Sequence, residues 1–368
     1  MAERTISVLG ATGYTGGLIV HELRRRGVPV LAAARNADKL RRLADEAGGV
    51  ETVQVDVGDR AALERLAARS RVLINTVGPF IDFGEPVVRA AITHGAHYLD
   101  TTGEQPFIKN MLVHDEWARK QGVAVVPAQA FEVAVSDSAA AVAAEGYRDV
   151  TSVHVTYVTR FHPSQGTQRT VLRMLQSAGY AYVGGKWVEE ATARHVRSFT
   201  GPAPIGHVTA VSFPSAEVIT IPRHVSAREV RVFMAVPGVA ARILSATAPL
   251  LPRLMRTPLA QLPAWFVGSG TDGPDEATRR ADGFHVVVDV RGVRRGAAAH
   301  TRVLVHGVDP YGLTAVATAY GAEQMCRPDY DRKGVLPPAG AFDARPFLDS
   351  LAAWGLTYET EENVKRET

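Results

Sequence analysis

Short apolar runs alternate with helical patterns through the first third of the chain. The runs are TISVL (5–9), VPVLAAA (28–34), VETVQV (50–55), RVLINTV (71–77), HYLD (97–100) and VAVVPA (123–128). Between them, leucines recur at helical spacing, as in DKLRRLADEAG and DRAALERLAARS. Strands joined by helices of this length pair in parallel through right-handed crossovers. The pattern therefore predicts an α/β fold whose first domain is a Rossmann-type, doubly wound parallel sheet.

The pattern changes after residue 128. VTSVHVTYVTR (150–160) alternates with period two, and FHVVVDVRGV and AAAHTRVLVHGV resemble two strands joined by the turn RRG. Strands without intervening helices predict a second, α+β domain over 129–308, built on a mixed or antiparallel sheet. We expect this domain to bind the substrate and to mediate dimerisation.

The last part of the chain is expected to return to the first domain. YGLTAVATAYGAEQM (311–325) predicts a helix that ends before Pro328, so that residues 309–368 complete the domain formed by residues 1–128. The tail is expected to be helical over Phe347–Trp354 and then charged and frayed.

The segment Val232–Met255 is the most apolar long stretch, but Arg242 and several prolines interrupt it. A membrane-spanning helix needs about 18 or more apolar residues, so we expect none here. The segment is predicted to be a helix packed in a core or over a pocket. A helix lying on a membrane surface or facing a lipid is the alternative.

Composition narrows the classes of protein. The 368 residues are 46% hydrophobic, which suggests about two domains with a sizeable core. A net charge of +3, from 41 basic and 38 acidic residues, does not predict nucleic-acid binding. A single cysteine, Cys326, fits a reducing compartment, and MAERTISVLG lacks a signal-peptide core, so a cytoplasmic location is expected. The spacing of His94 and His97 predicts no metal site.

A glycine motif follows the first predicted strand and opens a helix. Gly10, Gly13 and Gly16 form G-x-x-G-x-x-G, in which glycines allow a tight turn, close approach of a pyrophosphate and close packing of helix on strand. The amide groups and positive dipole end of the helix favour phosphate. The motif in this context predicts a dinucleotide site.

The end of the second strand distinguishes between cofactors. An NAD enzyme usually has an acidic residue there, but this chain reads AAARNADKL. Arg35 offers a fork of donors suited to a 2′-phosphate, and Lys39 follows one helical turn later, so NADP(H) is predicted. Asp56, after the third strand, is suited to accept a hydrogen bond from the adenine amino group, although either Asp56 or Asp59 could instead cap the next helix.

Several side chains are candidates for proton transfer. Glu104, Asp137 and His162 are the main catalytic candidates, with Tyr157 and Tyr182 as further ones. Each of the three has a structural alternative: a charge in the first turn of a helix, a cap of the helix beginning SDSAAAVAAE, and a surface histidine, respectively. YVGGK has the Tyr-x-x-x-Lys spacing of short-chain dehydrogenases, but its two glycines favour a hairpin turn instead.

Motifs along nearly the whole chain carry a family resemblance. GATGYTGG, NTVGPF, GEPVVRAAITHGAHYLDTTGE, SDSAA, SQGT, DPYGLTA and GVLPPAG resemble the saccharopine dehydrogenase-like oxidoreductases, and among them the trans-acting enoyl reductases. The resemblance implies pyrophosphate contacts from Gly10, Thr12, Gly13, Tyr14, Thr15 and Gly16, a 2′-phosphate contact from Arg35, and adenine contacts from Asp56 and Val57. It also implies that the nicotinamide side is formed by Val77, Gly78, Pro79 and Phe80 and closed by Thr102, Gly103 and Glu104.

One segment departs from the family pattern. AFEVAVSDS stands where relatives often read Gly-Phe-Asp-Ser-(Val/Ile)-Pro-Ser-Asp, so Phe131, Ser136 and Asp137 match while the residues around them differ. Because this segment lies at the predicted hinge between the domains, the substrate is expected to differ as well.

Three functions remain open at this stage. The first is an NADPH-dependent reductase acting on an activated C=C of a polyketide or lipid-like intermediate, as the enoyl reductase resemblance implies. The second is a C=N or C=O reductase, which the wider family resemblance includes. The third is a protein that senses NADP without catalysis. A homodimer is expected, as is peripheral membrane contact through 232–255 if that segment faces a lipid surface.

Overall fold

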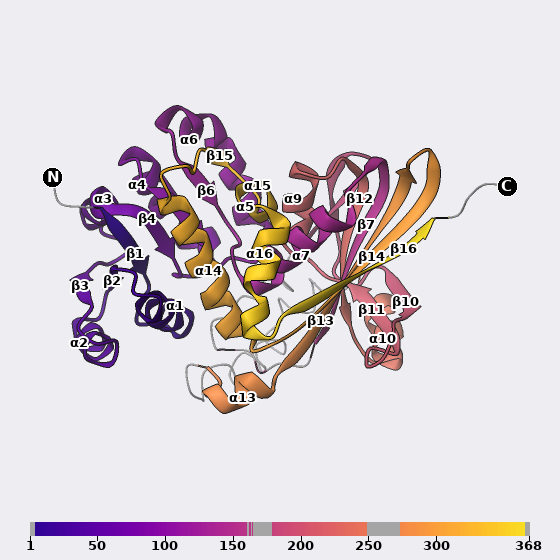
Figure 1. Cartoon of the computed structure of the whole chain (residues 1–368), viewed down its shortest axis with the longest axis horizontal. Coiled ribbons are helices and arrows are strands. Elements are labelled where there is room, and N and C mark those ends of the chain that lie inside the picture. Colours follow the sequence, from indigo (N-terminus) through magenta and orange to yellow (C-terminus); the bar gives the residue numbers. More distant parts are fainter. Residues whose placement is uncertain (1–3, 160–161, 163, 165–178, 249–272, 365–368) are drawn as a thin grey trace. The chain divides into compact units, whose positions relative to one another are not determined.

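The computed structural model describes residues 4–159, 162, 164, 179–248 and 273–364. The chain divides into two compact units (Figure 1). Unit 1 comprises Met1–Ala134 and Tyr311–Asp343, and unit 2 comprises Val135–Pro310 and Ala344–Thr368.

Unit 1 is built on a seven-stranded sheet in the order β15-β6-β5-β4-β1-β2-β3, and every neighbouring pair is parallel. The chain order reverses between β1 and β4, which makes their carboxyl ends the switch point where doubly wound sheets bind ligands. The predicted Rossmann-type sheet is confirmed. Its strands are β1 (Thr5–Leu9), β2 (Val30–Ala34), β3 (Glu51–Gln54), β4 (Ser70–Asn75), β5 (His97–Asp100), β6 (Ala124–Val126) and β15 (Gly334–Val335).

Helices join these strands. The helix predicted over 311–325 is α14, and it lies beside α1: the Tyr14 and Tyr311 rings are 5.0 Å apart, and Arg26 Nη1 lies 2.5 Å from Glu323 Oε2. A late segment of the chain is thereby part of the first unit. The helices are α1 (Tyr14–Arg25), α2 (Ala37–Glu46), α3 (Arg60–Arg69), α4 (Phe80–Thr93), α5 (Gln105–Met111), α6 (Asp115–Gln121), α14 (Pro310–Cys326) and α15 (Pro338–Ala341).

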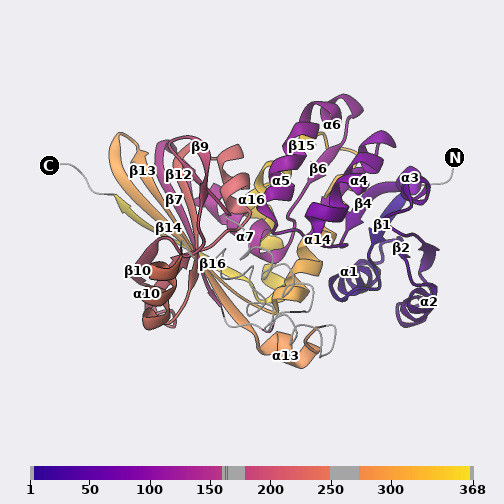
Figure 2. The same cartoon turned by 180° about the vertical axis from the view of Figure 1, so that it is seen from behind.

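Unit 2 contains a nine-stranded mixed sheet, in which β7 and β12 are parallel and the other pairs are antiparallel. Its main path runs β10-β11-β12-β7-β13-β14-β16 (Figure 2). The strands are β7 (Tyr147–Thr159), β8 (Gly179–Val183), β9 (Lys186–Glu190), β10 (Val196–Thr200), β11 (His207–Ser212), β12 (Ala227–Ala235), β13 (Gly283–Arg294), β14 (Ala297–Val308) and β16 (Thr357–Val364). The helices are α7 (Phe131–Ala143), α9 (Glu217–Thr220), α10 (Gly238–Thr247), α13 (Glu276–Ala281) and α16 (Ala344–Ser350).

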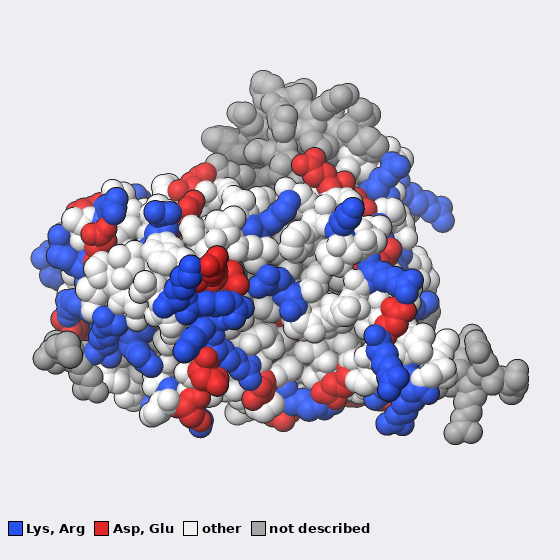
Figure 3. All heavy atoms as spheres, turned by 90° about the horizontal axis from the view of Figure 1, so that it is seen from above, with Lys and Arg blue, Asp and Glu red and all other residues white. Residues whose placement is uncertain are grey.

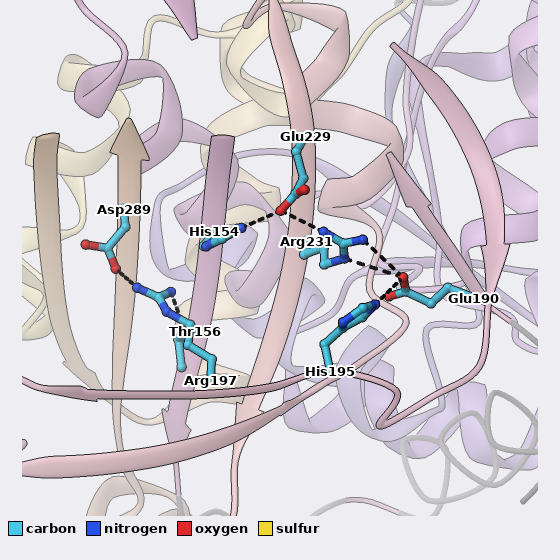
Figure 4. A network of polar contacts seen from close by, with 8 residues as sticks. All are labelled: His154, Thr156, Glu190, His195, Arg197, Glu229, Arg231 and Asp289. Carbon is cyan, nitrogen blue, oxygen red and sulfur yellow. Dashed lines mark hydrogen bonds and ion pairs between the residues drawn. The ribbon is translucent and has the colours of Figure 1, made fainter. Parts of the chain in front are cut away.

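Polar contacts on one face show that this sheet curls strongly. Figure 4 shows Arg197 of β10 reaching Thr156 on β7 at 3.0 Å and pairing with Asp289 on β13, although several strands separate β10 from β13 in the sheet. Burial alone would raise the pKa of Asp289, but hydrogen bonds from His300, Arg302 and Arg197 hold it below its ordinary value. The buried carboxylate thereby fastens β10 over the face of the sheet.

The structure differs from the sequence predictions at the end of the chain. Residues after Trp354 were expected to be frayed, yet Thr357–Val364 form β16 and pair with β14. Residues 344–368 therefore belong to unit 2 rather than to the first domain. The charged side chains of this segment suit an edge strand, which explains why its sequence resembles a solvated tail.

Two further predictions need adjustment. The helix expected to begin at SDSAA is α7, which already begins at Phe131, so Asp137 lies inside the helix and does not cap it. Residues 232–255 were expected to be one helix, but residues 232–235 belong to β12 and α10 covers Gly238–Thr247. Residues 249–255 lie outside the described residues.

The described surface carries both signs of charge. Figure 3 shows groups of basic side chains bordered by acidic ones on the face in view. Among the described residues, no helix has the length and apolar character needed to cross a membrane.

Candidate functional site

The glycine turn between β1 and α1 is closely packed. Gly10 has a φ of +85°, and its N–H donates to the Ala33 carbonyl at 2.9 Å. A Cβ atom at Gly10 would lie 2.5 Å from Thr76 Oγ1, and one at Gly16 would lie 2.3 Å from the Gly10 carbonyl oxygen. Gly10 therefore requires glycine both for backbone conformation and for space, and Gly16 requires it for space.

The start of α1 is suited to an anion. Gly13 is the N-cap residue and offers no side-chain cap, and the first turn contains no acidic residue. The first N–H groups of a helix have no partner within it, and together with the helix dipole they favour phosphate. The residues present thus fit the pyrophosphate of a dinucleotide, as the sequence predicts for Gly10–Gly16.

Arg35 lies next to this turn. It directly follows β2, whose residue Ala33 accepts hydrogen bonds from both Gly10 and Ala11. Arg35 is exposed, and its guanidinium has no hydrogen-bond or ion-pair partner among the described residues. Lys39 is also exposed, in the first turn of α2, where its N–H donates to Asn36 Oδ1. The geometry is consistent with the predicted 2′-phosphate contact.

The loop after β3 contains two aspartates, Asp56 and Asp59, and the structure shows which of them caps the next helix. Asp59 caps α3, because its Oδ1 accepts from the Ala62 N–H at 3.0 Å. Asp56 instead closes a turn, with Oδ1 accepting from the Gly58 N–H at 2.8 Å, and it is exposed. Val57 lines a cavity of about 430 Å³ between α3 and α4. Val57 therefore borders open space at this loop, which is consistent with its predicted role at the adenine.

Glu104 binds the start of α4. Its two carboxylate oxygens accept from the N–H groups of Phe80 and Ile81, each at 2.9 Å, and the side chain is 6% exposed. A carboxylate that accepts from two amides is held as an acceptor, so its local contacts are those of a helix cap rather than of a proton donor. Thr102 is buried and its hydroxyl accepts from the Glu104 N–H at 3.0 Å.

The other predicted nicotinamide-side residues follow β4. The Val77 N–H donates to Asn75 Oδ1 at 3.0 Å, and Phe80 packs against Phe107. Gly78 is exposed, Pro79 is half-buried, and Gly103 follows β5 at the same edge of the sheet. The structure therefore brings the predicted nicotinamide residues to the carboxyl ends of β4 and β5 in unit 1.

Asp137 and His162, the other two catalytic candidates, lie in unit 2. Asp137 is fully buried on α7, and its Oδ1 is 2.9 Å from His224 Nε2. His162 has a side chain 72% exposed, with Nδ1 2.9 Å from Asp282 Oδ1. Because a carboxylate accepts only, Nδ1 is the donor in this contact and Nε2 is left for another partner.

Tyr157 belongs to a buried polar cluster in unit 2. Its hydroxyl donates to Glu217 Oε1 and is 3.1 Å from Ser136 Oγ. Burial raises the pKa of Glu217, although hydrogen bonds from Ser215, Tyr157 and Ser136 oppose this. Tyr182 and Lys186 flank a two-glycine hairpin turn between β8 and β9, as predicted, with Gly184 and Gly185 both at positive φ.

Sequence reasoning missed several polar residues near these candidates. Asn75, Tyr98 and Asp100 form a buried chain of hydrogen bonds at the ends of β4 and β5, and His224 pairs with Asp137. The sequence did contain a sign of the hydrogen-bonded chain, because Tyr98 and Asp100 are polar residues two apart in a strand that is buried throughout. No local pattern pointed to His224, whose partner is 87 residues away.

Comparisons with known proteins show similarity in the first part of the chain. Residues 6–144 match the family model described as the saccharopine dehydrogenase NADP binding domain. The human saccharopine dehydrogenase-like oxidoreductase is 32% identical over 149 residues, covering 35% of each chain. The trans-acting enoyl reductase of Mycobacterium ulcerans (strain Agy99) is 33% identical over 142 residues, covering 37% of this chain and 34% of that protein. The match thus spans about a third of the relatives' length.

A solved structure is similar in fold to nearly the whole chain. Apo saccharopine dehydrogenase (L-Glu forming) from Saccharomyces cerevisiae superposes with a TM-score of 0.68 at 13% identity, covering 98% of this chain and 100% of that one. The α/β fold with a second, mixed-sheet unit is therefore that of saccharopine dehydrogenase. Residues 6–144 of this chain are thus similar to the saccharopine dehydrogenase NADP binding domain, and this similarity supports NADP(H) as the cofactor.

Proposed function

We propose that the protein is an NADPH-dependent reductase that acts on an activated C=C of a polyketide or lipid-like intermediate. The observation that carries this proposal is the glycine turn with the uncapped start of α1 beside the exposed Arg35. Bound NADPH supplies the hydride, while the protein supplies binding and orientation. Here Gly10–Gly16 would hold the pyrophosphate, and Arg35 would select the 2′-phosphate.

Two observations favour a lipid-like acceptor. The Mycobacterium ulcerans relative is named a trans-acting enoyl reductase. In addition, α10 exposes Val239 (73%) and Ile243 (60%) one helical turn apart, within the apolar segment 232–255. Exposed apolar side chains at this spacing form one stripe, which suits contact with an acyl chain or a lipid surface.

His162 is the best suited of the three predicted proton donors. Its imidazole is largely exposed and is oriented by Asp282, whose Oδ2 also accepts from the His162 backbone N–H at 2.8 Å. The carboxylate on Nδ1 orients the ring and leaves Nε2 for contact with a substrate. Glu104 and Asp137, by contrast, are buried and already engaged in local contacts.

The reaction class is tested by stopped-flow measurement of NADPH absorbance. The protein is mixed with NADPH and an excess of an α,β-unsaturated thioester, an imine or a ketone. We expect oxidation of NADPH with the thioester. Faster turnover of the imine or the ketone would replace the proposed acceptor by a C=N or C=O group. No oxidation with any acceptor of the three classes would favour a protein that senses NADP.

The cofactor assignment predicts the effect of one substitution. Arg35→Ala removes the donors for the 2′-phosphate, so the KM for NADPH is expected to rise at least about tenfold, since charge-assisted hydrogen bonds contribute about 1.5–3 kcal/mol. The KM for NADH should stay within about twofold, because NADH lacks that phosphate. Arg41→Ala, on an exposed residue of the following helix α2, serves as the control. Equal losses for both cofactors in Arg35→Ala would contradict the assignment.

A further inference from the structure

A chain of buried hydrogen bonds crosses the carboxyl ends of β4 and β5. Asn75 Nδ2 donates to Tyr98 Oη at 3.2 Å, and the Tyr98 hydroxyl donates to Asp100 Oδ2 at 2.8 Å. All three side chains are fully buried in unit 1. The three residues come from two neighbouring parallel strands, since Asn75 and Asp100 are paired in register.

The free ends of this chain hold backbone amides of the loops that follow the strands. Asn75 Oδ1 accepts from the Val77 N–H at 3.0 Å. Asp100 Oδ1 accepts from the N–H groups of Thr102, at 3.0 Å, and Ala128, at 2.8 Å. Side chains of two strands thus fasten the loops after β4, β5 and β6 to one another.

A buried polar network of this kind does not stabilise the fold more than apolar residues would, so its presence suggests another role. Burying an amide, a phenol and a carboxyl group in an apolar sheet is unfavourable even when each group is paired, and apolar residues of similar shape often replace such groups without loss. A fully satisfied buried network does, however, give rigidity and one defined arrangement. Here the arrangement it defines is that of Val77 and Thr102, both predicted to lie at the nicotinamide.

We propose that Asn75, Tyr98 and Asp100 are positioning residues for the nicotinamide half of NADP(H). This inference rests on the proposed function, because it takes the carboxyl ends of β4 and β5 as the nicotinamide side. The adenosine half has a separate set of supports, namely Arg35 after β2 and the Asp56 turn after β3. Loss of the network should therefore weaken binding of the whole cofactor and leave binding of its adenosine half unchanged.

The test compares two ligands by isothermal titration calorimetry. NADPH contains both halves, whereas adenosine 2′,5′-bisphosphate contains only the adenosine with its 2′-phosphate and its 5′-phosphate. Tyr98→Phe removes one hydroxyl and leaves the ring in place, so the fold is expected to persist. We expect it to raise the Kd for NADPH about fivefold to tenfold, the effect of losing one or two well-placed contacts, and to change the Kd for the bisphosphate less than about twofold. Asn75→Ala should give the same selective loss.

A buried hydrogen bond away from the carboxyl ends of the strands, at the start of β4, provides the matched control. Ser7 Oγ and Ser70 Oγ are 2.7 Å apart and fully buried, on β1 and β4. Ser7→Ala should lower the free energy of unfolding without changing either Kd. If Tyr98→Phe raised the Kd for both ligands equally, or changed neither Kd, the inference would be overturned and the network would have a purely structural role. Since no acceptor substrate is needed, failure of the reductase activity would be distinguished from failure of this inference.

Discussion

Asp100 is the residue at which burial and hydrogen bonding most clearly oppose each other. Burial raises the pKa of its carboxyl group to about 7, although the N–H groups of Ala128 and Thr102 and the hydroxyl of Tyr98 favour the ionised form. The charge of Glu104 adds to the rise. Near neutral pH this carboxyl group is therefore partly protonated, unlike an ordinary aspartate.

This shift predicts how stability depends on pH. Between about pH 4 and pH 7 the folded state binds a proton at Asp100 that the unfolded chain releases, so the free energy of unfolding falls as the pH rises. Above pH 7, ionisation of the buried Asp100 lowers the free energy of unfolding by at most about 4 kcal/mol for a pKa shift of this size. In Asp100→Asn the contribution is absent. Urea unfolding at pH 5 and pH 8 should show wild type losing stability relative to the variant.

Wild type must be compared with Asp100→Asn because His97 also makes stability depend on pH in this range. Burial lowers the pKa of its imidazole to about 4, so its contribution to stability rises with pH over the same range. That contribution is common to both proteins and cancels in the difference between them. Parallel stability curves for wild type and Asp100→Asn would contradict the predicted titration of Asp100.

At the scale of residues, the sequence was informative where chemistry follows a local pattern. The spacing of Gly10, Gly13 and Gly16, and the basic residue at the end of the second strand, could be interpreted without coordinates. Glu104 could not, because its partners, Phe80 and Ile81, are more than 20 residues earlier in the chain. A carboxylate in a motif indicates a candidate, and only its neighbours show whether it is a cap or a proton donor.

At the scale of elements, the cap on α4 is the contact that most affects the candidate site. The helix begins at Phe80, directly after the predicted nicotinamide residues, and its N-cap residue Pro79 has no side-chain acceptor. Glu104 supplies that acceptor from the loop after β5. The start of α4 and the loop after β5 are thus held together.

Glu104→Ala should therefore lower the free energy of unfolding by about 1–2 kcal/mol, the usual cost of losing a helix cap. Glu104→Gln keeps one acceptor oxygen and should lose about half as much. Asp59→Ala, which removes the side-chain cap of α3, gives a reference of the same kind. The measurement is chemical unfolding of the three variants. A far larger loss of turnover in Glu104→Gln than in Asp59→Ala would instead identify Glu104 as the proton donor.

Predicted elements were accurate where periodicity and turn chemistry agreed. The glycine pair between β8 and β9 and the RRG turn between β13 and β14 both give hairpins, with positive φ at Gly184, Gly185, Arg295 and Gly296. The segment 232–255 was harder, because a continuous apolar run does not distinguish a buried strand from a helix. Its first residues pair with β7, and only a later part is helical.

At the scale of the whole molecule, unit 2 is completed by the last described strand. β16 pairs with β14 from Thr357 to Val364, and Arg294 Nη1 lies 2.6 Å from Glu362 Oε1. The sequence could not indicate this strand, because the side chains of residues 357 and 359–362 are exposed and its charges resemble those of a free tail. Only pairing with a strand about 60 residues earlier makes it part of a sheet.

Two neighbouring proline substitutions test this pairing. Successive N–H groups of an edge strand point alternately toward the neighbouring strand and toward solvent, so only one of Thr360→Pro and Glu361→Pro removes a hydrogen bond to β14. That variant should lose about 1–3 kcal/mol in the free energy of unfolding, and the other should lose clearly less.

Cofactor binding supplies the control for the proline pair. Both residues belong to unit 2, whereas the predicted NADP contacts lie in unit 1, so the Kd for NADPH should stay within about twofold in either variant. Chemical unfolding and calorimetric titration measure the two quantities separately. If β16 were an unpaired tail, both prolines would be equally harmless, because a solvated backbone loses no hydrogen bond within the protein when one N–H is removed.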